Sequence, residues 1–232
     1  MNLLAIDTAT PDTVVALRTA EGRTHTRRHR PGSGERPGHV AQTLPLAREL
    51  LGEAGLDWSA LDRVAVGVGP GTFTGLRIGL ATARALASAG RTELVGVSTL
   101  AVLAAGAASD GPVVAVLDAR RREVFAAHWQ SSSAAAAGQP PSTGPLAIDP
   151  SALSAATGAG SALVVGDGGP RYREVLASGG FTVPADADPR HLVDGSVLCD
   201  LGARAAAGPP TAVLPVYVRA PDAIPVAERG RA

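Results

Sequence analysis

The same order of elements occurs in both halves of the chain. Each half begins with a short apolar run that ends in an aspartate, followed by a polar turn and a second apolar run. These runs are residues 3–6 before Asp7 with residues 13–18, and residues 113–117 before Asp118 with residues 123–129. Two β-prone runs around a short polar turn predict a hairpin. Helices and strands alternate after each hairpin, which predicts an α/β fold of two subdomains, each a mixed sheet flanked by helices.

Two helices of the first half have unusual faces. In residues 39–55 one apolar face repeats with helical spacing, and Leu46 and Leu50 form a second apolar row beside it. In residues 75–89 the small residues Gly75, Gly79 and Ala83 are four apart, and such a stripe lets another backbone approach closely. Two interpretations are open for these faces: both helices pack on the chain's own sheet, or the two faces form an interface with a partner protein.

Glycine-rich turns follow two predicted strands. Gly69 and Gly71 lie between a strand and a helix, and Gly166 and Asp167 follow residues 163–165. Backbone N–H groups at such a turn suit a phosphate, although neither the Walker spacing nor G-x-G-x-x-G is present. The alternative is that the glycines only permit a tight turn and close packing. Likewise, the paired aspartates 7 and 118 either hold Mg²⁺ at a nucleotide or cap their own turns.

The composition excludes several classes of protein. The 21 basic and 21 acidic residues balance to a net charge of +0, whereas a free-standing nucleic-acid binder usually has a basic excess. One cysteine, Cys199, excludes an intramolecular disulfide framework and fits a reducing compartment. The N-terminus lacks the basic region of a signal peptide, and no stretch is long and apolar enough to span a membrane. We therefore expect a cytoplasmic protein that binds no membrane.

Three segments read as irregular. Residues 27–38 are basic and rich in Gly and Pro, residues 131–144 are low in complexity, and residues 221–232 read as an unpacked tail. We predict a loop for the first segment and a mobile loop for the second. The predicted subdomains are residues 1–108 and 109–220, and a last helix at residues 195–207 is a candidate to pack back on the first subdomain.

Five blocks occur together in this order and carry a resemblance to a known family. They are AIDTAT, HVAQTLPL, VGVGPGTFTGLRIGLATARALA, DARRREVFAAHW and PVYVRAPDA. In this the chain closely resembles the bacterial TsaB (YeaZ) family, the non-catalytic companion of TsaD in making threonylcarbamoyladenosine on tRNA. The resemblance runs from Leu3 to about Asp222 and implies the duplicated fold of the actin/Hsp70/sugar-kinase (ASKHA) superfamily.

The resemblance also implies a partner surface and the loss of a metal site. It places a contact with TsaD, or with a second copy of the chain, on the two unusual helices, at His39, Thr43, Leu46, Leu50, Gly75, Arg77, Gly79 and Ala83. The histidine pair that binds metal in TsaD falls here on Thr99 and Leu103, and neither has an imidazole. The chain thus carries no metal site and no catalytic residue of its own.

The expected function is a scaffold or activating subunit of the complex that transfers a threonylcarbamoyl group to tRNA adenosine. TsaD is the expected main partner, with TsaE as another, a homodimer when TsaD is absent, and tRNA only through the complex. Arg27, Arg28, Arg30 and Arg36 are candidates for local tRNA contacts. No cofactor is expected for this chain alone, with ATP or ADP and Mg²⁺ as candidates at the complex interface.

A kinase or ATPase of the same fold is the alternative function. It would use a candidate nucleotide site at Asp7, Thr8, Gly69, Gly71, Asp118, Gly166 and Asp167. However, we can assign no catalytic carboxylate for phosphoryl transfer. A metallopeptidase is a third reading, and the chain shows no paired zinc ligands that would support it.

Overall fold

The computed structural model describes residues 1–90 and 92–219 and consists of two lobes, each built on one sheet. The first sheet has the strand order β3-β2-β1-β4-β5 and the second has the order β8-β7-β6-β9. The strands are β1 (Leu3–Asp7), β2 (Thr13–Arg18), β3 (Thr24–His29), β4 (Arg63–Gly69), β5 (Glu93–Ser98), β6 (Val113–Asp118), β7 (Val124–Trp129), β8 (Thr143–Ile148) and β9 (Leu163–Val165). The α-helices are α1 (His39–Glu53), α2 (Phe73–Gly90), α3 (Thr99–Gly106), α4 (Ser132–Ala136), α5 (Leu153–Thr157), α6 (Gly168–Arg171), α7 (Arg173–Ser178) and α8 (Gly195–Arg204).

The two sheets repeat one topology. In each, a first strand pairs antiparallel with the second and parallel with a later strand, β1 with β2 and β4, and β6 with β7 and β9. This is the duplicated hairpin order expected from the sequence. The predicted fold class, a duplicated α/β fold of two mixed sheets flanked by helices, is confirmed.

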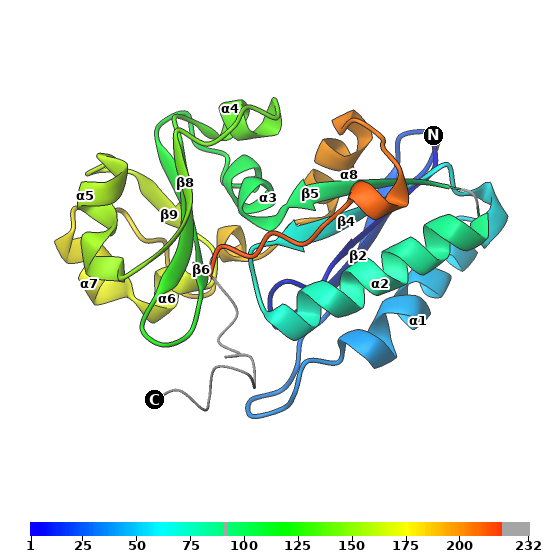
Figure 1. Cartoon of the computed structure of the whole chain (residues 1–232), viewed down its shortest axis with the longest axis horizontal. Helices are drawn as coiled ribbons and strands as arrows, with labels where there is room; N and C mark the ends of the chain where they lie inside the picture. Colours follow the sequence, from blue (N-terminus) through cyan, green and yellow to red (C-terminus); the bar gives the residue numbers. More distant parts are fainter. Residues whose placement is uncertain (91, 220–232) are drawn as a thin grey trace, which may run out of the picture.

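Helices cover both faces of the first sheet. The α1 and α2 helices lie side by side on one face, where Leu4 and Ile6 of β1 pack on α1, and Val64 and Val66 of β4 pack on α2 (Figure 1). The opposite face packs against α8, which contacts β1, β2 and β4. The last predicted helix therefore lies on the first lobe, although it follows the second sheet in sequence.

One hydrophobic cluster joins the lobes. It contains Leu3 and Val95 of the first sheet, Val113 and Val165 of the second, and Leu103 of α3. The α3 helix contacts β4 and β5 on one side and β6 and α4 on the other. Because these buried side chains form a single cluster, separating the lobes would expose apolar surface.

Both segments that we predicted as loops contain a strand. Within the predicted loop 27–38, residues up to His29 belong to β3, and the predicted mobile loop 131–144 contains α4 and the start of β8. The two predictions hold for residues 30–38 and 137–142 and are wrong for α4 and for the residues in strands, and the errors at the two strands have a common reason. Both strands lie at the edge of their sheets, where one side of the strand is free and polar residues are tolerated. The predicted tail 221–232 lies outside the described residues.

The chain after α8 returns along the first lobe and ends near the second. Gly208 bridges to Leu94 of β5, and Val216 N–H donates to the Val68 carbonyl at 2.8 Å. Arg219 then donates to the Ala119 carbonyl in the second lobe at 3.2 Å. Among the described residues, no helix has the length and apolar character needed to cross a membrane.

Candidate functional site

Asp7 lies at the carboxyl end of β1 and is fully buried. Its Oδ1 accepts the Ala9 N–H at 2.8 Å, and its Oδ2 accepts the Thr99 hydroxyl at 2.7 Å. A Cβ at Gly67 would lie 2.0 Å from Oδ2, so the neighbouring strand fits against this carboxyl only as glycine. Burial disfavours the charged form and raises the pKa of Asp7. The carboxyl thus ties β1 to α3 and faces no open space.

The glycine-rich turn after β4 packs on the β1–β2 turn. Thr72 N–H donates to the Ala9 carbonyl at 2.8 Å, and a Cβ at Gly71 would lie 2.3 Å from the same oxygen. Gly69 has φ 91°, a conformation that favours glycine. Thr8 approaches the helix behind the turn, where its hydroxyl donates to the Gly75 carbonyl at 2.8 Å. This geometry agrees with the second interpretation of these glycines, in which they permit a tight turn and close packing.

The second lobe contributes two carboxyl groups to the same cleft. Asp167 accepts the Asp118 N–H at 2.9 Å. Burial, with the nearby charge of Asp118, raises the pKa of Asp167 to about 6. Asp118 lies beneath two guanidinium groups, 3.5 Å from Arg120 and 3.4 Å from Arg171. Gly166 (φ 98°) packs on the Val116 carbonyl, 2.3 Å from where its Cβ would stand.

The candidate nucleotide residues therefore lie around one interlobe cleft, but the cleft is almost filled. Residues of the β1–β2 turn, the glycine turn and the β6–β7 turn enclose about 10 Å³ there. That is room for about one water molecule, whereas small-molecule sites occupy roughly 300–1,000 Å³. Nor does any group of three His, Cys, Asp or Glu residues suited to a metal occur among the described residues. This small cavity by itself fits neither ATP nor a nucleotide-bound Mg²⁺, and a groove of about 360 Å³ adjoins it at Thr10, Pro11 and Asp167.

The positions compared above with the TsaD metal motif have other partners. Thr99 begins α3 and bonds to Asp7, and Leu103 is 1% exposed within the shared core. Both side chains take part in packing between the lobes.

Most of the predicted partner-interface residues do not reach the surface, which corrects their assignment. Those buried within the chain are His39, Thr43, Leu50, Gly75, Gly79 and Ala83. His39 Nδ1 bonds to the Thr13 hydroxyl at 2.9 Å. The α2 stripe presses on the first hairpin, where a Cβ at Gly79 would lie 2.3 Å from the Thr8 hydroxyl. Leu46 is half-buried, and only Arg77 is exposed.

The outer face of α1 and α2 is formed by other residues. Val40 and Leu44 of α1 are 77% and 45% exposed. At the start of α2, Phe73 is 47% exposed, with the Arg77 guanidinium carbon 3.9 Å from its ring centroid. The Phe73 ring lies 5.5 Å from that of Tyr217. Apart from Arg77, sequence reasoning did not assign these residues to the partner surface, because a helical pattern does not show which side of a helix a neighbour covers.

A groove runs between α1 and the end of α2. It encloses about 480 Å³ and is mostly apolar, with Leu44 and Trp58 on one wall and Leu86 on the other. Trp58, in a short 3-10 turn, is 36% exposed. We call this groove and the exposed Val40 the α1–α2 face. Apolar surface of this kind usually marks a protein contact.

The arginines proposed for tRNA contact are largely engaged within the chain. Arg27 pairs with Glu53, and both Arg28 and Arg30 pair with the single carboxyl of Asp12. Arg28 also donates to the Val193 carbonyl and so links β3 to the segment before α8.

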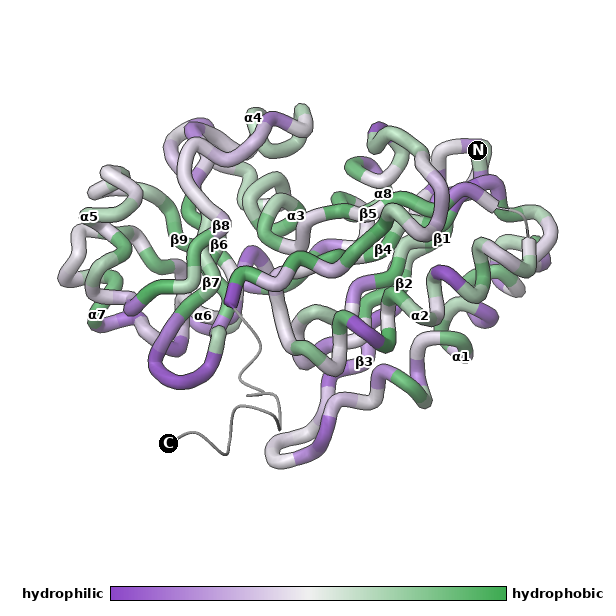
Figure 2. The backbone as a smooth tube through the Cα atoms, in the orientation of Figure 1, coloured by the Kyte–Doolittle hydropathy of each residue, from purple (hydrophilic) through white to green (hydrophobic). Residues whose placement is uncertain are grey.

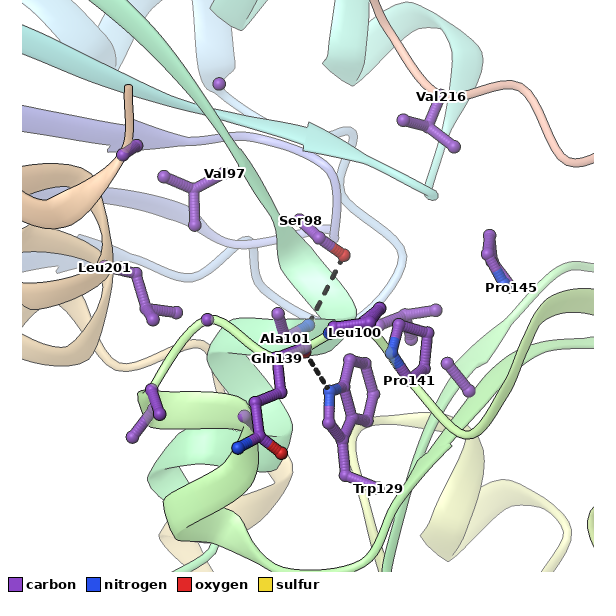
Figure 3. Close-up of a pocket in the computed structure, with 18 of the residues that line it drawn as sticks. Val97, Ser98, Leu100, Ala101, Trp129, Gln139, Pro141, Pro145, Leu201 and Val216 are labelled. Carbon is purple, nitrogen blue, oxygen red and sulfur yellow. Dashed lines mark hydrogen bonds between the residues drawn. The ribbon is translucent and has the colours of Figure 1, made fainter. Parts of the chain in front are cut away.

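A further cavity of about 570 Å³ lies between β5, α3, α4 and β7 (Figure 3). Leu100, Trp129 and Leu201 point into it, and the Trp129 Nε1–H donates to the Gln139 carbonyl at 3.0 Å. Its walls contain no paired acid and base. Sequence reasoning missed this cavity because it depends on α4, which we predicted as loop.

Comparison with known proteins identifies the family. The family model described as "TsaD: tRNA N6-adenosine threonylcarbamoyltransferase" matches residues 34–139. An uncharacterized protein of Mycobacterium tuberculosis is 34% identical, over 97% of this chain and 95% of its own length. The structure of YeaZ from Pseudomonas aeruginosa is 30% identical with a TM-score of 0.75, over 93% of this chain and 99% of that one. The chain belongs to the YeaZ (TsaB) family.

The family links the chain to tRNA threonylcarbamoyladenosine biosynthesis. Escherichia coli TsaB, named as a protein of that pathway, is 38% identical over 133 residues, which is 56% of this chain and 55% of TsaB. Haemophilus influenzae TsaB is 35% identical over 54% of this chain. The resemblance stated from the sequence blocks is therefore confirmed.

Proposed function

We propose that this YeaZ-family chain is a non-catalytic subunit that binds TsaD and supports the transfer of a threonylcarbamoyl group to adenosine in tRNA. The α1–α2 face carries this proposal. It presents the exposed apolar side chains of Val40, Leu44 and Trp58 beside a groove that α2 also lines, and the opposite sides of both helices are fixed on a buried sheet. A rigid apolar face of this kind favours helix-to-helix docking.

The filled interlobe cleft supports a non-catalytic role. A cavity of about 10 Å³ holds no nucleotide, and no metal cluster occurs in the described part of the chain. In this proposal the chain works in the cytoplasm and needs no cofactor of its own. TsaE joins the complex, and ATP or ADP with Mg²⁺ binds where the chain meets TsaD. Without TsaD, the same face forms a homodimer.

The proposal is tested by size exclusion with light scattering on the chain mixed with its cognate TsaD. Val40→Glu with Leu44→Glu places two charges on the α1–α2 face without changing a buried residue. The matched control is Val175→Glu on α7, where the side chain is 39% exposed on the other lobe. We expect wild type and control to form a complex with TsaD, and the double variant to lose at least about 100-fold in affinity, since each buried charge opposes association.

Two outcomes would overturn the proposal. If the wild-type chain and TsaD elute separately with TsaE and ATP present, the partner is wrong. If the chain alone hydrolyses ATP, and Asp7→Asn abolishes this, a self-sufficient ATPase replaces the scaffold.

A further inference from the structure

The turn between β6 and β7 holds three consecutive arginines in an unusual backbone conformation. Arg120, Arg121 and Arg122 have φ of 63°, 53° and 62°. Left-handed backbone disfavours residues with a Cβ, and glycine or asparagine is common there. In the described part of the chain, Ala108 is the one other non-glycine residue with positive φ. The sequence thus keeps arginine side chains where the backbone favours glycine, which points to a role for the side chains.

Hydrogen bonds fix this strained turn in place. The Ala119 N–H donates to the Glu123 carbonyl and the Glu123 N–H to the Arg120 carbonyl, both at 3.0 Å. The Asp118 carboxyl accepts the Arg120 N–H at 3.0 Å. The turn is therefore a rigid support, on which the side chains of Arg120 and Arg122 are exposed. Figure 2 shows it as a strongly hydrophilic loop at the end of the second sheet.

Positive charge exceeds negative charge around the turn. The side chains of Arg120 and Arg171 are 65% and 56% exposed and share the single carboxyl of Asp118, whose side chain is 9% exposed. Arg122 is exposed and makes no ion pair with any described residue. Two guanidinium groups on one carboxylate, with a third that has no ion pair among the residues described, leave a local excess of positive charge that can bind an anion.

A groove with balanced charge adjoins the turn toward the first lobe, since Arg28 and Arg30 both pair with Asp12 and the carboxyl of Asp186 also lines it. It encloses about 360 Å³ and runs past Thr10, Pro11 and Asp167 to Arg28 and Arg30. Those first three residues also line the small interlobe cavity that reaches Arg120, so the two hollows adjoin. The loop after β3, also hydrophilic, borders the same side of the molecule in Figure 2. The excess of positive charge therefore lies at the turn and not along the groove.

We propose that this arginine turn binds the phosphate backbone of an RNA through Arg120, Arg122 and Arg171. The guanidinium fork matches phosphate oxygens, and none of the exposed large apolar side chains lies in the turn or the groove. A protein partner would need an apolar centre, which the arginine turn itself lacks. Aromatic residues are 3% of the chain, so contacts to phosphate rather than base stacking fit the site. The identity of this RNA as tRNA rests on the function proposed above.

The test uses Arg120→Gly with Arg122→Gly in the full chain. Glycine relieves the left-handed backbone while it removes two charges, so loss of RNA binding is separated from loss of folding. The probe is an unmodified tRNA transcript, titrated against the chain alone and against its complex with TsaD between 50 and 200 mM salt. Arg23→Ala is the control, because it removes a charge from the turn before β3 at the far end of the first sheet.

We expect the glycine variant to bind the transcript about 10- to 100-fold more weakly in the complex, with a salt slope reduced by about two and an unchanged or raised melting temperature. Arg23→Ala should bind as wild type does. Equal binding by wild type and the glycine variant in both samples overturns the inference. Equal binding of polyglutamate overturns RNA as the ligand. Failure of the chain to associate with TsaD overturns the proposed function alone, since the titration of the isolated chain still tests the turn.

Discussion

The β1–β2 and β6–β7 turns occupy equivalent places in the two halves of the fold but use their aspartates differently. Asp7 is fully buried and bonds to a backbone N–H and a hydroxyl. Asp118 lies under two exposed guanidinium groups at the edge of the cleft. The first turn thus became part of the packing between the lobes, and the second became a charged surface. Duplicated topology fixes where strand ends meet, while the residues at those ends determine their role.

The largest effect is expected where the first turn is most tightly packed. Gly67→Ala would place a Cβ 2.0 Å from the Asp7 carboxyl, which two hydrogen bonds hold in place. We expect a loss of about 4 kcal/mol in the free energy of unfolding, measured by urea denaturation. The control Gly52→Ala in α1, whose Cβ meets nothing within 4 Å, should gain roughly 0.5–1 kcal/mol. Equal stability of both variants would show that the structure can accommodate a Cβ at Gly67 beside the Asp7 carboxyl.

The second half holds a half-buried carboxyl, that of Asp167, whose ionisation affects how stability depends on pH. The pKa of Asp167 is about 6 in the folded chain because burial disfavours the charge, against 3.8 for an ordinary aspartate. The folded state therefore binds the proton of Asp167 more tightly than the unfolded state does. This protonation stabilises the folded chain below about pH 4, and the stabilisation is lost as the pH rises through 6.

Asp167→Asn removes this dependence. Between pH 4 and 6 the wild type should lose about 2 to 3 kcal/mol relative to the variant, measured by denaturation at several pH values. Parallel pH profiles would mean that the carboxyl is well solvated and that the cleft is more open than its geometry indicates.

A direct comparison of the two strand-end aspartates should give a smaller difference. Asp7→Ala leaves the buried Thr99 hydroxyl without an acceptor, which costs roughly 2–3 kcal/mol. Asp118→Ala removes ion pairs to exposed arginines and should cost about 1 kcal/mol. Melting temperatures of the two variants check this order. The reverse order would make the second turn the structural one.

The sequence predicted the hairpins and central strands of both halves, because their apolar runs are long enough to identify a buried strand. It failed at the third strand of each half, since β3 and β8 are edge strands with polar or irregular composition. It also failed for the glycine stripe of α2. Small residues at helical spacing indicate a close approach, but only the fold shows that Thr8 of the chain itself makes that approach. The packing of α1 and α2 on their own sheet also determines which side chains stay exposed on the α1–α2 face.

The smallest effect concerns the strained turn of the second half. Arg122 has φ 62°, and its side chain makes no ion pair within the described residues. Arg122→Gly should therefore raise the free energy of unfolding by about 0.5–1 kcal/mol, because glycine adopts this conformation without steric cost. Differential scanning calorimetry measures the gain, and Arg23→Gly, outside the positive-φ residues, is the control and should lose stability. A loss in both variants would mean that Arg122 supports the fold, and the contrast between a packed first turn and a charged second turn would no longer hold.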